Sequence, residues 1–337
     1  MWAYRFLRPV LFCLSAETAH HVSLWALKWA VKMGFVRVNT PTQNVTCCGL
    51  PFANRVGLAA GLDKNGDYID ALAALGFGFI EVGTVTPRPQ AGNPKPRLFR
   101  LVQQQALINR MGFNNKGVDH LVAQVKKAKF RGVLGINIGK NKDTPLEEAV
   151  DDYLLCLQKV YAVASYVTIN ISSPNTEGLR GLQEGEALEG LLKALHQERL
   201  MLTKTRNKTV PLWVKIAPDM DAAEIQTVAD TLVQCEMDGV IATNTTLERT
   251  LVADSSYAGE AGGLSGKPLQ SRATDTIRLL KKHLQGKIPI IGVGGIHDAE
   301  SALEKIDAGA SLIQMYTGFI FRGPDLVHEC INSLRSD

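Results

Sequence analysis

Short, nearly continuous apolar runs alternate with longer amphipathic stretches along most of this chain. One clear run is Tyr166-Val167-Thr168-Ile169, and the polar hexapeptide Asn170-Ile171-Ser172-Ser173-Pro174-Asn175 follows it directly. A short, β-branched apolar run is typical of a buried parallel strand, and Pro174 cannot donate a hydrogen bond to a strand ladder. The pattern therefore predicts a buried strand that ends in a polar loop. Taken alone, the hexapeptide could also be an ordinary Ser/Pro/Asn turn.

Seven further runs have the same character as this one. The eight predicted strands cover residues 55–60, 79–82, 133–138, 166–170, 212–216, 239–243, 289–292 and 312–315. Helical patterns lie between them, among them residues 146–163, 187–205, 222–235 and 299–308. Eight strand–helix units in about 280 residues have the length of a closed (β/α)8 TIM barrel. Residues 55–337 are therefore predicted to form an α/β barrel, and a doubly wound sheet is the alternative.

The first 38 residues have a different pattern. Helical spacing predicts two helices over residues 3–14 and 16–33, with Ser15 as an N-cap between them and Gly34 as the stop. The segment carries three of the four tryptophans and five basic residues against Glu17 alone. Glu17 and Lys28 interrupt any apolar run long enough to span a membrane. A basic amphipathic pair indicates a segment that lies on a membrane surface; a packed helical cap and a signal peptide are the alternatives.

Composition narrows the class of protein. The six cysteines form no C-x-x-C pair, which argues against a disulfide framework, an iron–sulfur site or a zinc site. The net charge of +4 resides wholly in residues 1–38, so the rest of the chain lacks the basic stripe of a nucleic-acid-binding protein. We therefore expect neither a metal nor a nucleic acid as partner. Residues 39–54, rich in Pro, Thr and Asn, are predicted to be a linker.

Polar or glycine residues follow nearly every predicted strand, and the carboxyl ends of barrel strands form the catalytic face. Glycines at 292–295 are expected to open the seventh helix, and residues 316–318 the eighth, which is where barrels commonly hold a phosphate. The polar residues that line the rest of the barrel mouth suit a phosphate ligand with a large flat body. A phosphorylated flavin, FMN, fits better than a dinucleotide, because no G-x-G-x-x-G follows a strand. Three long connections, residues 87–116, 171–184 and 246–267, are expected to be lids or binding loops.

Five stretches in order closely resemble the dihydroorotate dehydrogenases. They are the sequences at 59–64 (AAGLDK), 109–114 (NRMGFN), 170–175 (NISSPN), Lys215, and 243–245 (TNT). The resemblance runs over essentially the entire chain. Soluble class 1 members have a cysteine in the hexapeptide where this chain has Ser173. Serine there, together with the N-terminal helical extension, is similar to the membrane-associated, quinone-reducing class 2.

The resemblance implies oxidation of (S)-dihydroorotate to orotate in de novo pyrimidine biosynthesis, with one FMN per chain as hydride acceptor and a membrane quinone as final acceptor. It also implies a monomer bound peripherally to the cytoplasmic face of the cell inner membrane. Ser173 would be the catalytic base, assisted by Lys64, with Thr176 and Phe113 in the proton relay. His20 and Arg100 would line the quinone access.

The remaining implied contacts fall into two sets. Orotate would be held by Lys64, Asn109, Arg110, Met111, Gly112, Phe113, Asn170, Asn175, Asn244 and Thr245. FMN would be held by Ala60, Gly61, Thr84, Asn137, Asn170, Lys215, Thr243, Gly266, Gly294, Gly295, Tyr316 and Thr317.

The chemistry of the residues agrees with this resemblance. Oxidising a saturated C–C bond beside a carbonyl needs a base for the acidic C–H and a hydride acceptor on the other side. A serine is a poor base at neutral pH, so Ser173 needs the positive field of Lys64 and a proton relay. Lys215 would stabilise negative charge at N1 of the reduced flavin. The rival hypotheses are a barrel aldolase with Lys215 as its Schiff-base lysine, and a non-catalytic membrane-bound barrel.

Overall fold

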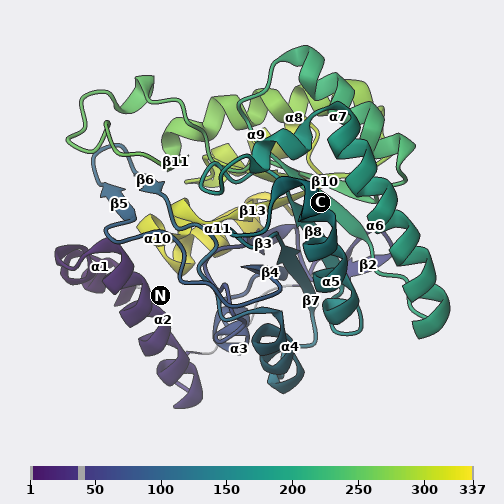
Figure 1. Cartoon of the computed structure of the whole chain (residues 1–337). Helices are drawn as coiled ribbons and strands as arrows, with labels where there is room; N and C mark the ends of the chain where they lie inside the picture. The colour runs from purple at the N-terminus through teal and green to yellow at the C-terminus, as the bar shows by residue number, and fades with distance from the viewer. Residues whose placement is uncertain (1–2, 37–41, 336–337) are drawn as a thin grey trace.

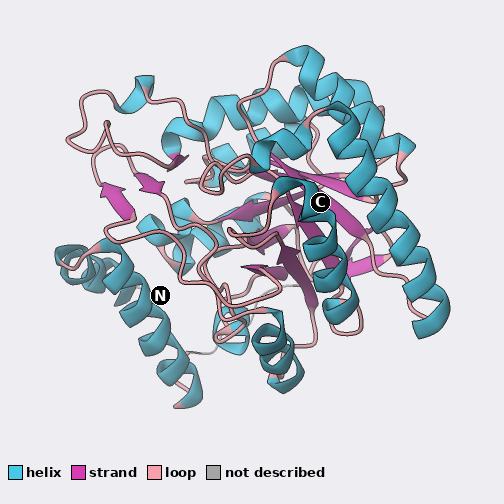
Figure 2. Ribbon diagram, viewed as in Figure 1, coloured by secondary structure: helices cyan, strands magenta, loops and turns pink. Residues whose placement is uncertain are grey.

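The computed structural model describes residues 3–36 and 42–335. Eight parallel strands close into a barrel, and helices surround it (Figures 1 and 2). The prediction of a (β/α)8 barrel is therefore confirmed. In chain order the barrel strands are β3 (Val56–Leu58), β4 (Phe79–Val85), β7 (Val133–Ile138), β8 (Tyr166–Asn170), β9 (Leu212–Ile216), β10 (Gly239–Ala242), β12 (Ile290–Val293) and β13 (Leu312–Met315).

Helices follow the strands as the amphipathic patterns predicted. They are α3 (Ile69–Ala73), α4 (Val118–Lys127), α5 (Ala149–Val160), α6 (Gly185–Arg206), α7 (Ala222–Gln234), α8 (Gln270–Leu284), α9 (Ala299–Ala308), α10 (Thr317–Arg322) and α11 (Pro324–Ser333). Short 3-10 turns add η1 (Leu146–Glu148), η2 (Leu179–Gln183), η3 (Thr250–Val252) and η4 (Lys267–Leu269). One prediction was wrong: residues 292–295 do not open a helix, because α9 begins after Asp298, whose side chain caps it in a box with Ser301.

Three aromatic rings fill the amino-terminal half of the barrel interior, and each faces a glycine on an adjacent strand of the barrel. The register pairs Gly57 with Phe79, Gly135 with Tyr166 and Gly239 with Trp213. A Cβ added at Gly135 would lie 2.1 Å from Cζ of Tyr166, and the other two glycines are equally close to their rings. Interior positions of a small barrel must alternate in size, so the glycines make room for the rings.

A β-hairpin lies within the predicted linker. Strands β1 (Val45–Cys47) and β2 (Leu50–Phe52) are antiparallel, and Cys48 and Gly49 both have positive φ in the turn between them. Phe52 is buried and meets the ring of Phe79 edge-on, with centroids 5.0 Å apart. The hairpin therefore packs on the rings inside the barrel. Residues 39–41 of the predicted linker lie outside the described residues.

Two of the long connections contribute strands to a second small sheet. Strands β5 (Leu98–Leu101), β6 (Ala106–Asn109) and β11 (Gly263–Gly266) pair antiparallel in the order β11-β6-β5. The pairing of β6 with β11 joins residues about 150 positions apart, for example Leu107 with Ser265. Figure 1 shows these strands on the side of the molecule where α1 and α2 lie.

The N-terminal segment forms the two predicted helices, α1 (Ala3–Cys13) and α2 (Ala16–Lys32). Ser15 caps α2, its Oγ accepting a hydrogen bond from the Thr18 amide at 3.3 Å, and Gly34 follows the helix with a φ of 77°. The pair packs on the barrel through α3, α10 and β5. Among the described residues, no helix has the length and apolar character needed to cross a membrane.

Candidate active site

A pocket of about 1070 Å³, partly open to solvent, lies at the carboxyl ends of the barrel strands. The structure brings most of the predicted site residues together on its walls. Those that line it are Ala60, Gly61, Lys64, Thr84, Asn109, Met111, Gly112, Phe113, Asn170, Ser173, Asn175, Lys215, Thr243, Asn244, Thr245, Gly266, Gly294, Gly295, Tyr316 and Thr317.

Five predicted residues lie outside the lining. Asn137 is fully buried beneath the pocket, and Thr176 is buried in the loop after β8. Arg110 points away, because its guanidinium pairs with Glu260 at 2.5 Å and stacks on Phe99. His20 and Arg100 lie where the N-terminal helices meet the barrel. Arg100 donates to the Phe12 carbonyl oxygen at 3.1 Å and covers the Phe12 ring at 4.1 Å.

Glu81, which the sequence reasoning missed, organises the floor of the pocket. Its carboxylate is fully buried and accepts hydrogen bonds from Asn137 Nδ2 at 2.8 Å, Gln314 Nε2 at 2.8 Å, Tyr166 Oη at 3.0 Å and Thr168 Oγ1 at 3.2 Å. Four donors satisfy a charge that would otherwise be costly to bury. Burial lowers the pKa of Lys215, which lines the pocket, and the negative charge of Glu81 opposes that shift.

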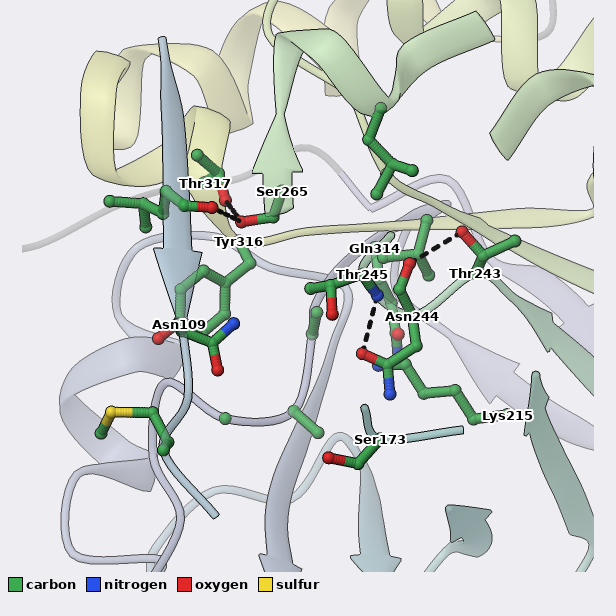
Figure 3. A pocket seen from close by; sticks show the side chains of 18 of the residues that line it. Asn109, Ser173, Lys215, Thr243, Asn244, Thr245, Ser265, Gln314, Tyr316 and Thr317 are labelled. Carbon is green, nitrogen blue, oxygen red and sulfur yellow. Dashed lines mark hydrogen bonds between the residues drawn. The ribbon is translucent and has the colours of Figure 1, made fainter. Parts of the chain in front are cut away.

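Side-chain amides and hydroxyls form one wall around Ser173. Asn244 donates to Ser172 Oγ at 3.0 Å, and Asn175 donates to Asn109 Oδ1 at 3.2 Å. Ser173 is buried, and its Oγ accepts from the Asn175 amide at 3.2 Å. Figure 3 places Ser173, Asn244 and Lys215 on the same side of the pocket. This wall offers donors and acceptors suited to the edge of a flat, carbonyl-rich ligand.

Two polar atoms of the pocket residues are buried without any hydrogen-bond partner among the described residues. They are Thr245 Oγ1 and Gln314 Oε1. An unpaired buried hydroxyl or carbonyl costs roughly 1–3 kcal/mol, so such a group in a native protein calls for a partner such as water, an ion or a ligand. Lys215 Nζ likewise makes no hydrogen bond within the described part of the chain. The donor set therefore fits a polar heterocycle such as a flavin ring with a small planar substrate.

The end of the pocket near α10 is suited to an anion. Gly294 and Gly295 have φ of 109° and 78°, and a Cβ at Gly295 would lie 2.2 Å from Cα of Gln270. Only glycine therefore permits this turn. Thr317 begins α10, and its hydroxyl shares a 2.8 Å hydrogen bond with that of Ser265, a pocket residue that the sequence reasoning missed (Figure 3). Free backbone N–H groups at such a turn and helix start suit a phosphate.

Lys64 lies between this pocket and the N-terminal helices. Burial lowers its pKa to about 8, with a further contribution from the charge of Arg97, while Glu17 and Asp63 oppose the shift. Its Nζ donates to the Gly61 carbonyl oxygen at 3.1 Å. Burial also lowers the pKa of His20 to about 3, and the nearby positive charge of Lys64 adds to that shift. His20 is therefore neutral at physiological pH.

Comparison with known proteins agrees with these motifs. A family model described as dihydroorotate dehydrogenase matches residues 42–337. A protein of Acinetobacter baylyi named "Dihydroorotate dehydrogenase (quinone)" is 57% identical over 98% of this chain and 99% of its own length. One of the same name from Aeromonas hydrophila subsp. hydrophila is 59% identical with the same coverage. A crystal structure of a DHODH from Eimeria tenella in complex with ferulenol superposes with a TM-score of 0.87 at 38% identity, covering 96% of this chain and 93% of that one.

Proposed function

The chain belongs to the dihydroorotate dehydrogenase family, and we propose that its pocket holds one FMN and binds dihydroorotate against the wall that carries Ser173. The enzyme oxidises (S)-dihydroorotate to orotate in de novo pyrimidine biosynthesis and passes the electrons to a quinone. The observation that carries the proposed site is the meeting of Ser173, Lys64 and the buried amides in one pocket with the unpaired Thr245 Oγ1 and Gln314 Oε1.

The choice of FMN rests on the two ends of the pocket. The anion-suited turn at Gly294 and Gly295 would hold the phosphate, with Thr317. The floor, with Lys215 and the Gln314 carbonyl, would hold the ring; Asn137 acts beneath it by fixing Thr84 Oγ1 and Asn170. When bound, the flavin supplies the hydride acceptor of the reaction.

The residues of the chain supply the other parts of the mechanism. Ser173 Oγ removes the acidic proton beside the carbonyl of dihydroorotate. A serine hydroxyl is a poor base, so it needs help in this role. The positive charge of Lys64 on the pocket wall stabilises the alkoxide form of Ser173, and it also attracts the carboxylate of dihydroorotate. Thr176, buried three residues further along the same loop, passes the proton towards solvent, and the ring of Phe113 at the pocket wall borders that route. The buried amides orient the pyrimidine ring.

The N-terminal helical pair is proposed to bind the cytoplasmic face of the inner membrane as a peripheral anchor, with the protein a monomer. Large apolar side chains are exposed on both helices and just beyond them, including Phe6 (76%), Trp25 (61%), Met33 (64%) and Phe35 (82%). Lys28 and Lys32 lie on the same segment. Exposed aromatic residues beside basic ones suit an anionic lipid surface. His20 and Arg100, between this pair and the barrel, would border the path of the quinone.

Identification of the bound flavin tests the proposal. Denaturing the purified protein should release FMN at one molecule per chain, identified by mass. With dihydroorotate in excess and neither quinone nor oxygen present, a single turnover should yield one orotate per flavin. Release of a dinucleotide, or of no flavin, would refute the proposed cofactor; a flavin that dihydroorotate fails to reduce would refute the proposed site.

A further inference from the structure

A buried ion pair joins the N-terminal helices to the loops of the pocket. Glu17, in the first turn of α2, and Arg97, just before β5, are 8% and 7% exposed. Arg97 Nη2 donates to Glu17 Oε1 at 2.8 Å, and its Nε lies 3.3 Å from both carboxylate oxygens. Burial alone would raise the pKa of Glu17, but the hydrogen bonds and charge of Arg97 lower it. Glu17 therefore carries its negative charge at neutral pH, opposite the guanidinium of Arg97.

The same guanidinium continues the connection towards the pocket. Arg97 Nη1 donates to the carbonyl oxygens of Ala91 at 2.7 Å and Asn93 at 2.9 Å. Asn93 Nδ2 in turn donates to the carbonyl oxygens of Arg110 at 3.0 Å and Asn175 at 3.3 Å.

Those two carbonyl groups belong to the stretches that bear the amides of the pocket wall. Asn93 also packs against Gly112, where an added Cβ would lie 3.0 Å from the Asn93 backbone nitrogen. A chain of hydrogen bonds thus runs from α2 to both stretches, while Glu17, Arg97 and Asn93 themselves do not line the pocket.

A second, electrostatic connection runs through Lys64. Among the charged and titratable groups around Lys64, Glu17 and Asp63 raise its pKa, and Arg97 lowers it. His20 and His21, one turn beyond Glu17 on α2, lie close enough for Lys64 to lower their pKa values. Since Lys64 lines the pocket, the charge of Glu17 acts on the pocket as well as on the loops.

We propose that Glu17, Arg97 and Asn93 are positioning residues for the dihydroorotate site, so that the N-terminal helices shape the substrate pocket as well as serving the quinone. The inference rests on the proposed function, because it assumes that the pocket binds dihydroorotate and orotate. A chain of hydrogen bonds does not by itself prove that the helices influence the pocket. The test is therefore to break the chain at Glu17, Arg97 or Asn93 and to measure ligand binding at the pocket.

The test uses the full-length holoenzyme in detergent, with orotate binding measured by calorimetry and dihydroorotate oxidation by steady-state kinetics. Asn93→Ala removes only the last link, and Glu17→Gln removes the charge while keeping the shape. Each should raise the orotate Kd and the dihydroorotate KM by about 3- to 30-fold, the range for one lost hydrogen bond to a charged or buried group, with a smaller change in kcat. Arg97→Lys should recover part of the affinity that Arg97→Met loses.

Two control variants separate positioning from general destabilisation. Asp238→Asn breaks another ion pair, between the partly exposed Asp238 and the buried Arg199, neither of which lines the pocket. It should lower the melting temperature and leave the orotate Kd unchanged. Lys32→Gln changes a charge on α2 far from Glu17 in the sequence and should also leave the Kd unchanged.

The double variant Glu17→Gln/Asn93→Ala should lose less affinity than the product of the two single losses, because both residues act on one site. Orotate Kd and dihydroorotate KM equal to wild type in both single variants would overturn the inference, as would losses that match those in Asp238→Asn. If wild-type holoenzyme itself fails to bind orotate, the proposed function fails instead, so the two failures are distinguishable.

Discussion

Replacing Thr245 with valine should affect the stability of the protein and its affinity for orotate in opposite directions. Thr245 Oγ1 is buried at the pocket and has no hydrogen-bond partner among the described residues. Valine has nearly the same shape but no hydroxyl group. An unpaired buried hydroxyl costs roughly 1–3 kcal/mol, so removing it should leave the free energy of unfolding unchanged or raise it by up to about 1 kcal/mol.

Under the proposed function, Thr245 Oγ1 bonds to orotate, so the same substitution should also weaken orotate binding. Loss of about 1–3 kcal/mol of binding corresponds to a Kd that is roughly 5- to 150-fold higher. Orotate titration of the holoenzyme measures the Kd, and thermal unfolding without orotate measures the stability. The backbone contacts of residue 245 do not depend on its side chain. The hydrogen bond that Arg180 Nη2 donates to its carbonyl oxygen at 2.9 Å can therefore form with valine as well.

The neighbouring Thr246 provides the matched control. Its hydroxyl donates to Asp219 and accepts from the Glu248 amide at 3.0 Å, so it is already satisfied within the protein. Thr246→Val should lower the stability by about 1 kcal/mol and leave the Kd unchanged. A Thr245→Val protein that is less stable than wild type and binds orotate normally would refute the reasoning, because the hydroxyl would then serve the fold and not the ligand.

Four further outcomes are expected. Ser173→Ala should keep its flavin and bind orotate but reduce the flavin about 10²- to 10⁴-fold more slowly in stopped flow, with Ser173→Cys partly active; a rate near wild type removes Ser173 from the mechanism. His20→Ala and Arg100→Ala should slow quinone reduction without slowing flavin reduction, and equal effects on both half-reactions would contradict their placement. The orotate Kd should rise above pH 8, where Lys64 with its pKa of about 8 loses its charge, and a Lys64→Met protein should lack this dependence. Gly135→Ala should lower the free energy of unfolding by about 1–3 kcal/mol or more, because the added Cβ would lie 2.1 Å from the Tyr166 ring. Urea unfolding measures this loss.

The barrel was predictable because its strands are buried on both faces. Runs such as 133–138, 166–170 and 212–216 are almost wholly apolar, and the structure has strands over those same residues. The β1–β2 hairpin and the β5-β6-β11 sheet were not predicted. Strands β6 and β11 stabilise each other across about 150 residues of sequence, which no local pattern contains.

The site was predictable where polar residues follow a strand, and less so where they lie inside one. Ser173, Asn244 and Lys64 stood out for this reason. Glu81 and Gln314 lie within buried strands and were passed over, although a single polar residue inside an apolar run was a usable signal. Glu17 entered the sequence reasoning only as the one acidic residue of a basic segment and as an interruption of its apolar runs. Its buried contact with Arg97 depends on how α2 packs on the barrel, which only the structure shows.

The central claim is tested most directly by following the flavin absorbance of the purified protein under anaerobic conditions. Dihydroorotate should bleach the flavin in one turnover and yield orotate, and a soluble quinone added afterwards should restore the absorbance. A colourless protein, or a bound flavin that dihydroorotate leaves oxidised, would contradict the account. Trapping of a substrate on Lys215 by borohydride in such a colourless protein would favour the barrel aldolase instead.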